Sequence, residues 1–466
     1  MTQRAWPAWA RASEIVDLLR LSLPIAVSRM SMMLMSVTDA IVLGQFDEAE
    51  LPFVLNSWLP IGVALGLGMG LLLGVQVLTS EMLGRNEARH SGRVFRRGFI
   101  WAVGLGLVSM IVVYWGAEPL FRWVFVDINP NSSISATLTP GEVAGEITSV
   151  THILSFSLVA FMLSTMCAFY LEALRRPLIV TWVMYLGVIV NLIIDLALVA
   201  GWWGMPQLGA EGVAWATTGS RWALTIVLLG VVIWLTPALK PSEPGPANEP
   251  KRQLAVGVGT AISNVAEWGG FNLTFVIAAF ISLAVNAVYG YTIQVMGVCF
   301  MLFLGIGSAT SVRVAEHYGR RDFEGVRNAS RLGVAATFIV GAVLTVLVLA
   351  TGPWLALVLV DRNAEIDGIM LAPAITALLI YAAIAVTFDG LQAVASMALR
   401  AQEIVWLPSL IHIGSFFVVM IPASYQAGIV WERGAQGLME AIVFALILAG
   451  CLQWFVLEYK TARQVN

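Results

Sequence analysis

The chain alternates between long apolar windows and short polar connectors. A helix that crosses a bilayer needs about 20 apolar residues, and Gly, Pro and charged residues divide this sequence into twelve such windows. The pattern therefore predicts twelve membrane-spanning helices. The predicted spans are residues 19–44, 54–80, 97–119, 148–172, 178–200, 210–236, 254–283, 286–312, 330–359, 369–399, 406–428 and 435–458.

Composition agrees with a chain that lives in lipid. Of the 466 residues, 59% are hydrophobic and only 12% are charged, whereas soluble domains carry about 25% charged residues. The basic residues gather in a few connectors, which is the pattern of membrane topology and not of nucleic-acid binding. We therefore expect a multi-pass membrane protein surrounded by lipid, a monomer, with no nucleic-acid partner and no cofactor.

The distribution of Lys and Arg predicts the orientation. When the connectors are placed alternately on two sides, 21 of the 26 Lys and Arg residues fall on the side of the termini. The positive-inside rule puts this side, and both termini, in the cytoplasm, with the spans in a bacterial inner membrane. The N-terminal stretch with Arg4, Trp6 and Trp9 lacks the apolar core of a cleaved signal peptide, so an amphipathic segment at the membrane surface is expected.

The chain divides into two similar halves. Residues 237–253, which begin PALKPSEPGPANEP, form a predicted cytoplasmic linker between an N-lobe (1–236, spans one to six) and a C-lobe (254–466, spans seven to twelve). Offsets of 235 and then 225 residues bring one half into register with the other. The matching residues are Gly70 and Gly305, Glu81 and Glu316, Gly84 and Gly319, Arg85 and Arg320, Arg96 and Arg331, Gly98 and Gly333, and Ala173 to Arg175 with Ala398 to Arg400.

The repeat predicts a symmetric fold. Because six spans separate equivalent positions, both halves cross the membrane with the same polarity. We therefore expect an all-α integral membrane protein whose two six-helix lobes are related by a pseudo-twofold axis along the membrane normal. Transporters place their cavity between such halves, although a duplication can also serve stability alone.

Several motifs occur in order at particular spans. SVTDAIVLGQF carries Asp39 in the first span, and the run from Asn191 to Trp222 covers the fifth and sixth. SNVAEWGGF carries Glu267 in the seventh span, and FDGLQAVASMALR carries Asp389 in the tenth. Together these motifs resemble the multidrug and toxic compound extrusion (MATE) family, in particular its NorM branch. The resemblance implies the fold of the MOP superfamily and a secondary antiporter that exports cationic or amphipathic drugs in exchange for Na+ or H+ by alternating access.

Asp39 is a candidate coupling residue. A charge at bilayer depth costs about 2.5 to 3.5 kcal/mol on insertion scales, so such a residue faces a cavity or a partner. Helical spacing places Met32, Met35 and Ser36 on the face of Asp39, and polarizable Met side chains beside an acid suit lipophilic cations. A pairing with Arg29 is the alternative, although ten residues separate the two by about 15 Å along one helix.

A first-half cation site is expected around Asp39. Asn191 and Asp195 are four residues apart and share one face of the fifth span. With Asp39 and with Thr217 or Thr218 they supply oxygen ligands, which hard cations such as Na+ prefer. The alternative is that Asp195 is solvated near the outer interface. The resemblance also implies this site, since family members with a first-lobe cation site use these helices.

Glu267 and Asp389 are a second candidate pair. The seventh and tenth spans run in opposite directions, which brings both acids toward a common depth, where burial and like charge favour uptake of a shared proton or Na+. Several family members carry an aromatic residue one turn before the tenth-span acid. This chain has Ala385 there, and the nearest ring before that position is Tyr381, a further candidate for the substrate cavity. Carboxylates serve Na+ and H+ alike, so the coupling ion is left open.

Other polar residues in the spans have structural interpretations. Glu81 and Glu316 lie beside basic loops and are expected to form surface salt bridges. His412 is a lone histidine, and neighbouring residues are expected to satisfy the hydrogen bonds of its ring. Arg221 is expected to pair with either Asp195 or a lipid headgroup.

An enzyme, a flippase and a channel are the alternatives to an exporter. No HExxH, GxSxG or P-loop spacing occurs, so an enzyme is not expected. A lipid or lipid-linked oligosaccharide flippase of the same superfamily is the main alternative. Such proteins often line their cavity with Arg or Lys to hold phosphate. The deep charges here are mainly acidic, which favours cationic cargo. A channel is the third alternative, but the duplication into two lobes favours alternating access instead.

Overall fold

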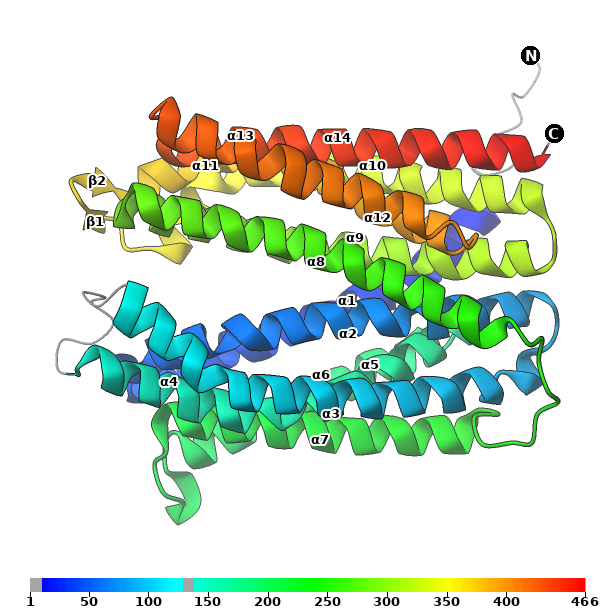
Figure 1. The fold of residues 1–466 in the computed structure, drawn as a ribbon, viewed down its shortest axis with the longest axis horizontal. Coiled ribbons are helices and arrows are strands. Elements are labelled where there is room, and N and C mark those ends of the chain that lie inside the picture. The colour runs from blue at the N-terminus through cyan, green and yellow to red at the C-terminus, as the bar shows by residue number, and fades with distance from the viewer. Residues whose placement is uncertain (1–10, 129–137, 466) are drawn as a thin grey trace. The chain divides into compact units, whose positions relative to one another are not determined.

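The computed structural model describes residues 11–128 and 138–465, which are almost entirely helical (Figure 1). Within these residues, twelve helical stretches are long and apolar enough to cross a membrane, which confirms the predicted number of spans. Arg4, Trp6 and Trp9 of the predicted amphipathic segment lie outside the described residues. The twelve stretches are Ala12–Phe46, Leu51–Gly84, Ala88–Asp127, Pro140–Ala173, Pro177–Leu198, Gly209–Leu235, Glu249–Ile281, Leu283–Gly319, Phe323–Leu359, Leu371–Arg400, Trp406–Val430 and Gly434–Val465.

The chain folds as two compact units. Unit 1 takes the described residues of 1–29, 80–87 and 252–466, and unit 2 takes the described residues of 30–79 and 88–251. The long helices α1 (Ala12–Phe46) and α2 (Leu51–Gly84) therefore contribute to both units. The lobe boundaries expected from the sequence stay a prediction.

Unit 2 is organised around one fully buried helix. Every residue of α5 is buried, and α5 packs against α3 and α7. A helix buried on all sides has to be apolar all round, and its one charged residue, Glu172, accepts a hydrogen bond from Gln76 of α2 at 2.8 Å. Besides α1 and α2, the elements of unit 2 are η2 (Glu48–Glu50), η3 (Ala88–His90), α3 (Gly92–Arg122), η4 (Trp123–Ile128), α4 (Pro140–Ser155), α5 (Ser157–Ala173), α6 (Pro177–Leu198), η5 (Trp202–Gly204) and α7 (Gly209–Leu235).

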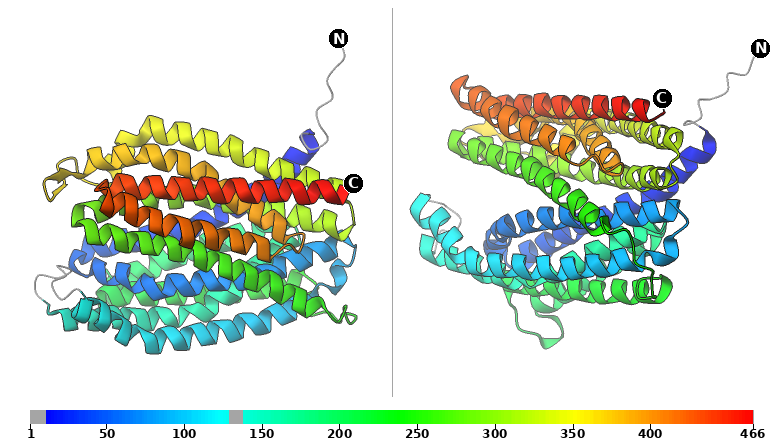
Figure 2. Two further views of the ribbon diagram at one scale, coloured as in Figure 1. Left: turned by 45° about the horizontal axis from the view of Figure 1, so that its top comes forward. Right: turned by 45° about the vertical axis from the view of Figure 1, so that its right-hand side comes forward.

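Unit 1 is organised around α11, which packs against α9, α10 and α14 (Figure 2). Its core includes Phe303, Ile375 and Leu446, all essentially inaccessible. The eleventh span mixes α-helical with π-helical segments. Besides parts of α1 and α2, and apart from residues 249–251 of α8, which belong to unit 2, its elements are α8 (Glu249–Ile281), α9 (Leu283–Gly319), α10 (Phe323–Leu359), β1 (Glu365–Ile366), β2 (Ile369–Met370), α11 (Leu371–Arg400), α12 (Trp406–His412), η6 (Ile413–Met420), α13 (Ile421–Tyr425), η7 (Gln426–Val430) and α14 (Gly434–Val465).

A two-residue hairpin between α10 and α11 was not predicted. Glu365 pairs with Met370 and Ile366 with Ile369 in an antiparallel register. The turn residues Asp367 and Gly368 have φ values of 52° and 78°. Asp-Gly is the sequence that favours a tight turn with both central residues at positive φ, so the hairpin follows from this dipeptide.

Large apolar side chains remain exposed along the helices. Trp234 is 90% exposed, Val358 83% and Trp115 75%. Water would penalise such exposure by roughly 25 cal/mol per Å² of apolar surface, whereas lipid chains do not. These faces are what a helix presents to a bilayer, and the protein is a multi-pass membrane protein.

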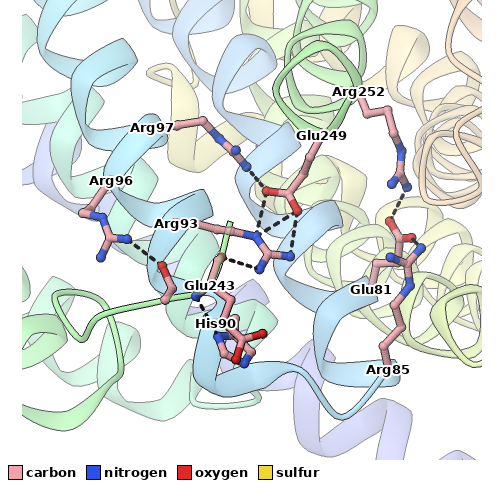
Figure 3. A network of polar contacts seen from close by, with 10 residues as sticks. Glu81, Arg85, His90, Arg93, Arg96, Arg97, Glu243, Glu249 and Arg252 are labelled. Carbon is pink, nitrogen blue, oxygen red and sulfur yellow. Dashed lines mark hydrogen bonds and ion pairs between the residues drawn. The ribbon is translucent and has the colours of Figure 1, made fainter. Parts of the chain in front are cut away.

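Three arginines of α3 hold the segment that follows α7. Within unit 2, Arg93 and Arg97 both form ion pairs with Glu249 (Figure 3). Arg96 donates to the carbonyl of Lys240 at 3.0 Å and to the hydroxyl of Ser242 at 2.6 Å. The predicted linker is therefore tied by its carbonyls and side chains to the first turns of α3.

Within unit 1, α2 and α9 end against each other. A Cβ atom added to Gly84 would meet the backbone oxygen of Glu316, and one added to Gly319 would meet that of Glu81. Only glycine, which lacks Cβ, permits this approach. The residues involved are two of the pairs that match between the halves.

The expected surface position of Glu81 and Glu316 is wrong. Glu81 pairs with Arg85 and, at 2.6 Å, with Arg252, and Glu316 pairs with Arg320 at 3.9 Å. However, the two glutamates are only 3% and 2% exposed, respectively. They are buried because the ends of α2 and α9 pack so closely.

Candidate functional site

In unit 2, residues from three helices gather around Asp39 of α1. The Asp39 carboxyl is buried and accepts a hydrogen bond at 3.0 Å from the hydroxyl of Thr217 of α7. Asn191 and Asp195 of α6 are fully buried and approach the same carboxyl. The structure thus brings together four of the residues that the sequence proposed for a first-half cation site.

Thr217 and Thr218 point in different directions. The Thr218 hydroxyl donates to the carbonyl of Ile153 in α4 at 3.1 Å. Successive residues of a helix lie about 100° apart around its axis, so both cannot face Asp39. Of the two alternatives, Thr217 is the neighbour of Asp39, and Thr218 connects α7 to α4.

Many polar atoms of this cluster lack a hydrogen bond within the described part of the chain. They are Oδ1 of Asp39, both amide atoms of Asn191 and both carboxyl oxygens of Asp195, all buried. Buried polar groups are normally paired, and an unsatisfied one costs about 1–3 kcal/mol. Two adjacent buried carboxylates also repel each other unless a proton or cation lies between them. The cluster is therefore suited to binding a cation or a proton.

Arg221 lies on the same helix one turn beyond Thr217. Its guanidinium donates to Ser157 at 3.2 Å and lies over the ring of Trp58, 5.2 Å from the ring centroid. Its charge acts on Asp39 through space. Of the two partners expected from the sequence, Asp195 is not among the groups that Arg221 contacts in the described residues, where the rings of Trp58 and Phe161 lie against the cation. A contact with a lipid headgroup stays a prediction.

The predicted lining residues of α1 lie in different surroundings. Met35 lies beside Gly187 of α6, one turn from Asn191. Met32 is partly buried and Ser36 is exposed. Their role in a substrate cavity stays a prediction.

In unit 1, Glu267 of α8 and Asp389 of α11 lie on either side of Gln392. The Gln392 amide nitrogen donates to Glu267 Oε1 at 3.2 Å and to Asp389 Oδ1 at 3.1 Å. All three side chains are buried. The predicted acid pair is therefore brought together, through a residue that sequence reasoning missed. Its signal was its position three residues after Asp389, on the same helix face.

Two further polar residues extend this cluster. His412 Nε2 lies 2.6 Å from Gln392 Oε1, so the lone histidine does have a neighbour, as expected. Arg400, which directly follows the predicted tenth span, is only 2% exposed. It donates to the hydroxyls of Ser263 at 2.6 Å and Ser396 at 3.2 Å. Its charge acts on the carboxyl of Glu267.

Tyr381 belongs to a different polar cluster. Its hydroxyl accepts from Gln436 at 2.9 Å and donates to Glu440 at 3.3 Å. Glu440 also pairs with Arg433 at 2.6 Å. Tyr381 precedes Asp389 by eight residues, or about 12 Å along the helix. Its role in a substrate cavity stays a prediction.

No group of three or more His, Cys, Asp or Glu side chains suited to a metal ion occurs in the described ranges. Na+ differs from a resident metal because it would be a transported coupling ion. Hard cations bind amide and hydroxyl oxygens as well as carboxylates. Asn191 and Thr217 beside two acids, and Gln392 beside two others, provide that mixture of oxygens.

Twelve membrane-spanning helices with a buried acid cluster in each half of the chain define a polytopic membrane transporter. The MatE family model matches residues 24–197 and 260–426, one segment in each half. The chain belongs to this family, the MATE transporters, and is therefore a transporter and not an enzyme.

Relatives and solved structures agree with this assignment. The chain is 33% identical over 444 residues to a probable multidrug resistance protein NorM of Caulobacter vibrioides, covering 94% of this chain and 90% of the relative. It is 26% identical over 455 residues to a probable NorM of Deinococcus radiodurans, covering 97% and 96%. An outward-facing multidrug resistance MATE transporter of the MOP superfamily shares the fold with a TM-score of 0.85 at 16% identity, covering 97% of each chain.

Proposed function

We propose that the protein is a secondary antiporter that exports cationic or amphipathic drugs across a bacterial inner membrane in exchange for Na+ or H+. Both termini would lie in the cytoplasm. Family membership and the NorM relatives, named as multidrug resistance proteins, support the cargo. The observation that carries the proposal is that each half holds buried carboxyls beside further oxygen ligands, Asp39 with Asp195 and Glu267 with Asp389.

Such clusters can couple an ion to a conformational change. A ligand shifts a conformational equilibrium only by its difference in affinity for the two states. The Asp39 cluster leaves several oxygens without donors, so a proton or Na+ would stabilise the conformation in which these atoms stay together. Alternating access would follow if drug binding favours the other conformation.

The charges within the spans favour cationic cargo. The acids Asp39, Asp195, Glu267 and Asp389 are buried without a direct Lys or Arg partner among the described ion pairs. Of the buried arginines, Arg221 and Arg400 hydrogen-bond to serine hydroxyls, and Arg313 pairs with Glu14 and Asp17. Since an anionic lipid would need free Arg or Lys, export of cations is preferred over the flippase alternative.

The test is ethidium efflux from proteoliposomes under separately imposed Na+ and pH gradients. We expect efflux with at least one gradient, and a severe loss of it in Glu267→Gln and Asp389→Asn at unchanged amounts of folded protein. Glu118→Gln, which makes the same chemical change at a side chain that is 60% exposed, should transport normally. Equal dye levels in protein-containing and empty liposomes would refute drug export, and lipid scrambling by the same liposomes would support the flippase.

A further inference from the structure

We propose that the side-chain amide of Gln392 is an internal placeholder for the coupling cation between Glu267 and Asp389, and that His412 holds it in that orientation. The inference rests on the proposed function in one respect, because it takes this acid pair as the ion site of the second half. It assigns roles to two residues that bind no ion themselves.

The amide group occupies the position that a bridging cation would take. Gln392 Nε2 lies 3.2 Å from Glu267 Oε1 and 3.1 Å from Asp389 Oδ1. An amide nitrogen carries two hydrogens and can donate both at once. The positive end of the amide dipole thus lies between two carboxyls in a site where all three side chains are at most 7% exposed.

His412 determines which way the amide points. Gln392 Oε1 lies 2.6 Å from His412 Nε2, and an amide oxygen can only accept. His412 Nε2 therefore carries the hydrogen, and the Gln392 nitrogen is directed to the carboxyls. The imidazole ring is held in turn by the ring of Phe416, 5.6 Å away between centroids. A reversed amide would turn its oxygen toward both acids, which is unfavourable.

The placeholder would make the ion-free state accessible. Two buried carboxylates without a donor repel each other and retain any cation that arrives. A donor between them lowers the free energy of the ion-free site, so that the ion can leave. An arriving cation has to displace the Gln392 amide, which lowers the apparent cation affinity. Gln392 therefore sets ion release, and His412 acts through Gln392 as a positioning residue.

The test is cation binding to the purified full-length protein, without transport. A ligand that binds the folded state raises the thermal unfolding midpoint as its concentration passes its dissociation constant. The midpoint is followed against Na+ concentration at fixed pH and, separately, against pH without Na+. We expect Gln392→Leu to lower the half-saturating cation concentration about tenfold, equivalent to about 1.4 kcal/mol.

His412→Leu is expected to shift affinity in the same direction by about threefold, and the double variant should match Gln392→Leu alone. Such non-additivity is the signature of residues that act as one unit. His412→Gln, which keeps a donor near the position of Nε2, should behave almost as the unchanged protein. Gln392→Met replaces Gln392→Leu if the latter does not fold, since it is closer in shape.

Two controls fix the location of the effect. Gln453→Leu makes the same change at another fully buried glutamine of unit 1 and should leave the cation dependence unchanged. In a Glu267→Gln background the effect of Gln392→Leu should vanish. An unchanged or raised half-saturating concentration in Gln392→Leu, additive effects of the two substitutions, or no Glu267-dependent cation effect at all would overturn the inference. Normal cation shifts without drug efflux would instead refute only the proposed drug export.

Discussion

The two oxygens of Asp39 have different surroundings. Oδ2 accepts the hydroxyl of Thr217 at 3.0 Å, whereas Oδ1 is buried with no hydrogen bond inside the described ranges. One donor therefore orients the carboxyl, and the other oxygen is open to an ion. The neighbouring threonine, Thr218, makes an equally good hydrogen bond to a carbonyl of α4, which gives a matched comparison.

We expect Thr217→Val to impair gradient-driven ethidium efflux severalfold and to change its dependence on the imposed ion, because Asp39 loses the donor that orients it. Thr218→Val removes a hydrogen bond that does not involve the acid and should cost only about 1 kcal/mol of stability. The measurements are efflux from proteoliposomes and the thermal unfolding midpoint of both variants. If the two variants transport equally well, Thr217 has no part in coupling.

Neighbouring residues of a site could be predicted from the sequence only where they lie on one face of the same helix. Asn191 and Asp195 share a face by their spacing along one helix, and that expectation needed no tertiary information. Whether Thr217 or Thr218 faces Asp39 depends on how α7 is rotated against α1 and α4, which packing decides. Gln392 shares a face with Asp389, but its contact with Glu267 needed the structure.

At the scale of elements, one carboxylate caps a helix from outside it. Glu50 of η2 accepts the backbone amide of Ala210 at the start of α7 at 2.6 Å. Gly209, the first residue of α7, lies against the same carboxyl with a φ of 51°. A carboxyl oxygen at this place satisfies one of the backbone amides that a helix leaves unpaired at its N-terminus, whether the group is charged or neutral. Glu50 therefore fixes the start of the helix that carries Thr217.

This cap should depend on pH. Burial raises the pKa of Glu50, the hydrogen bond from Ala210 opposes the shift, and Asp47, Glu146 and Glu211 add to it by like charge. Because the folded pKa lies above the ordinary value of 4.5, the contribution to stability is fully present below that value. It is lost as pH rises through the folded pKa.

Glu50→Gln keeps an acceptor for Ala210 and does not titrate. We therefore expect the unfolding midpoint of the variant to fall less than that of the unchanged protein as pH rises through this range. Thermal unfolding followed by circular dichroism at several pH values measures the difference, with Glu118→Gln as the exposed control. Parallel pH curves for Glu50→Gln and the unchanged protein would show that Glu50 contributes nothing to this dependence.

The boundaries of helices can be predicted from the sequence where a local signal marks them. The apolar windows located all twelve spans because a bilayer demands a minimum length. The fourth span begins at Pro140 and not at 148, because Thr139 and Glu142 form a capping box with Pro140 in the first turn. That signal, TPGE, was present in the sequence. The π-helical segments of the eleventh span had no such local signal.

At the scale of the whole molecule, two matching positions of the sequence repeat lie in contact with each other. Gly84 ends a helix of the first half and Gly319 ends the matching helix of the second, and each lies against the backbone of the other helix within unit 1. The sequence showed that these glycines correspond, but not that they meet. It also missed the burial of Glu81 and Glu316, since charged helix ends beside basic loops are usually exposed.

We expect Gly84→Ala and Gly319→Ala to destabilise the protein by about 1–3 kcal/mol, the usual cost of overpacking, because the added methyl group meets a carbonyl oxygen. Gly104→Ala is the matched control, since nothing lies within 4 Å of its added Cβ. It should be neutral or stabilising, as alanine favours helix over glycine by up to about 1 kcal/mol. Equal unfolding midpoints for all three variants would show that the helix ends separate at no cost.

The reciprocal contact of Gly84 and Gly319 limits how a duplicated gene can diverge. In an ordinary duplication each copy is free to accumulate changes as long as its own fold survives. Here a side chain gained at residue 84 presses on the second copy and one gained at residue 319 presses on the first. Each copy would therefore constrain the other, and we expect the Glu-x-x-Gly ending to persist in both copies long after the surrounding residues have drifted apart.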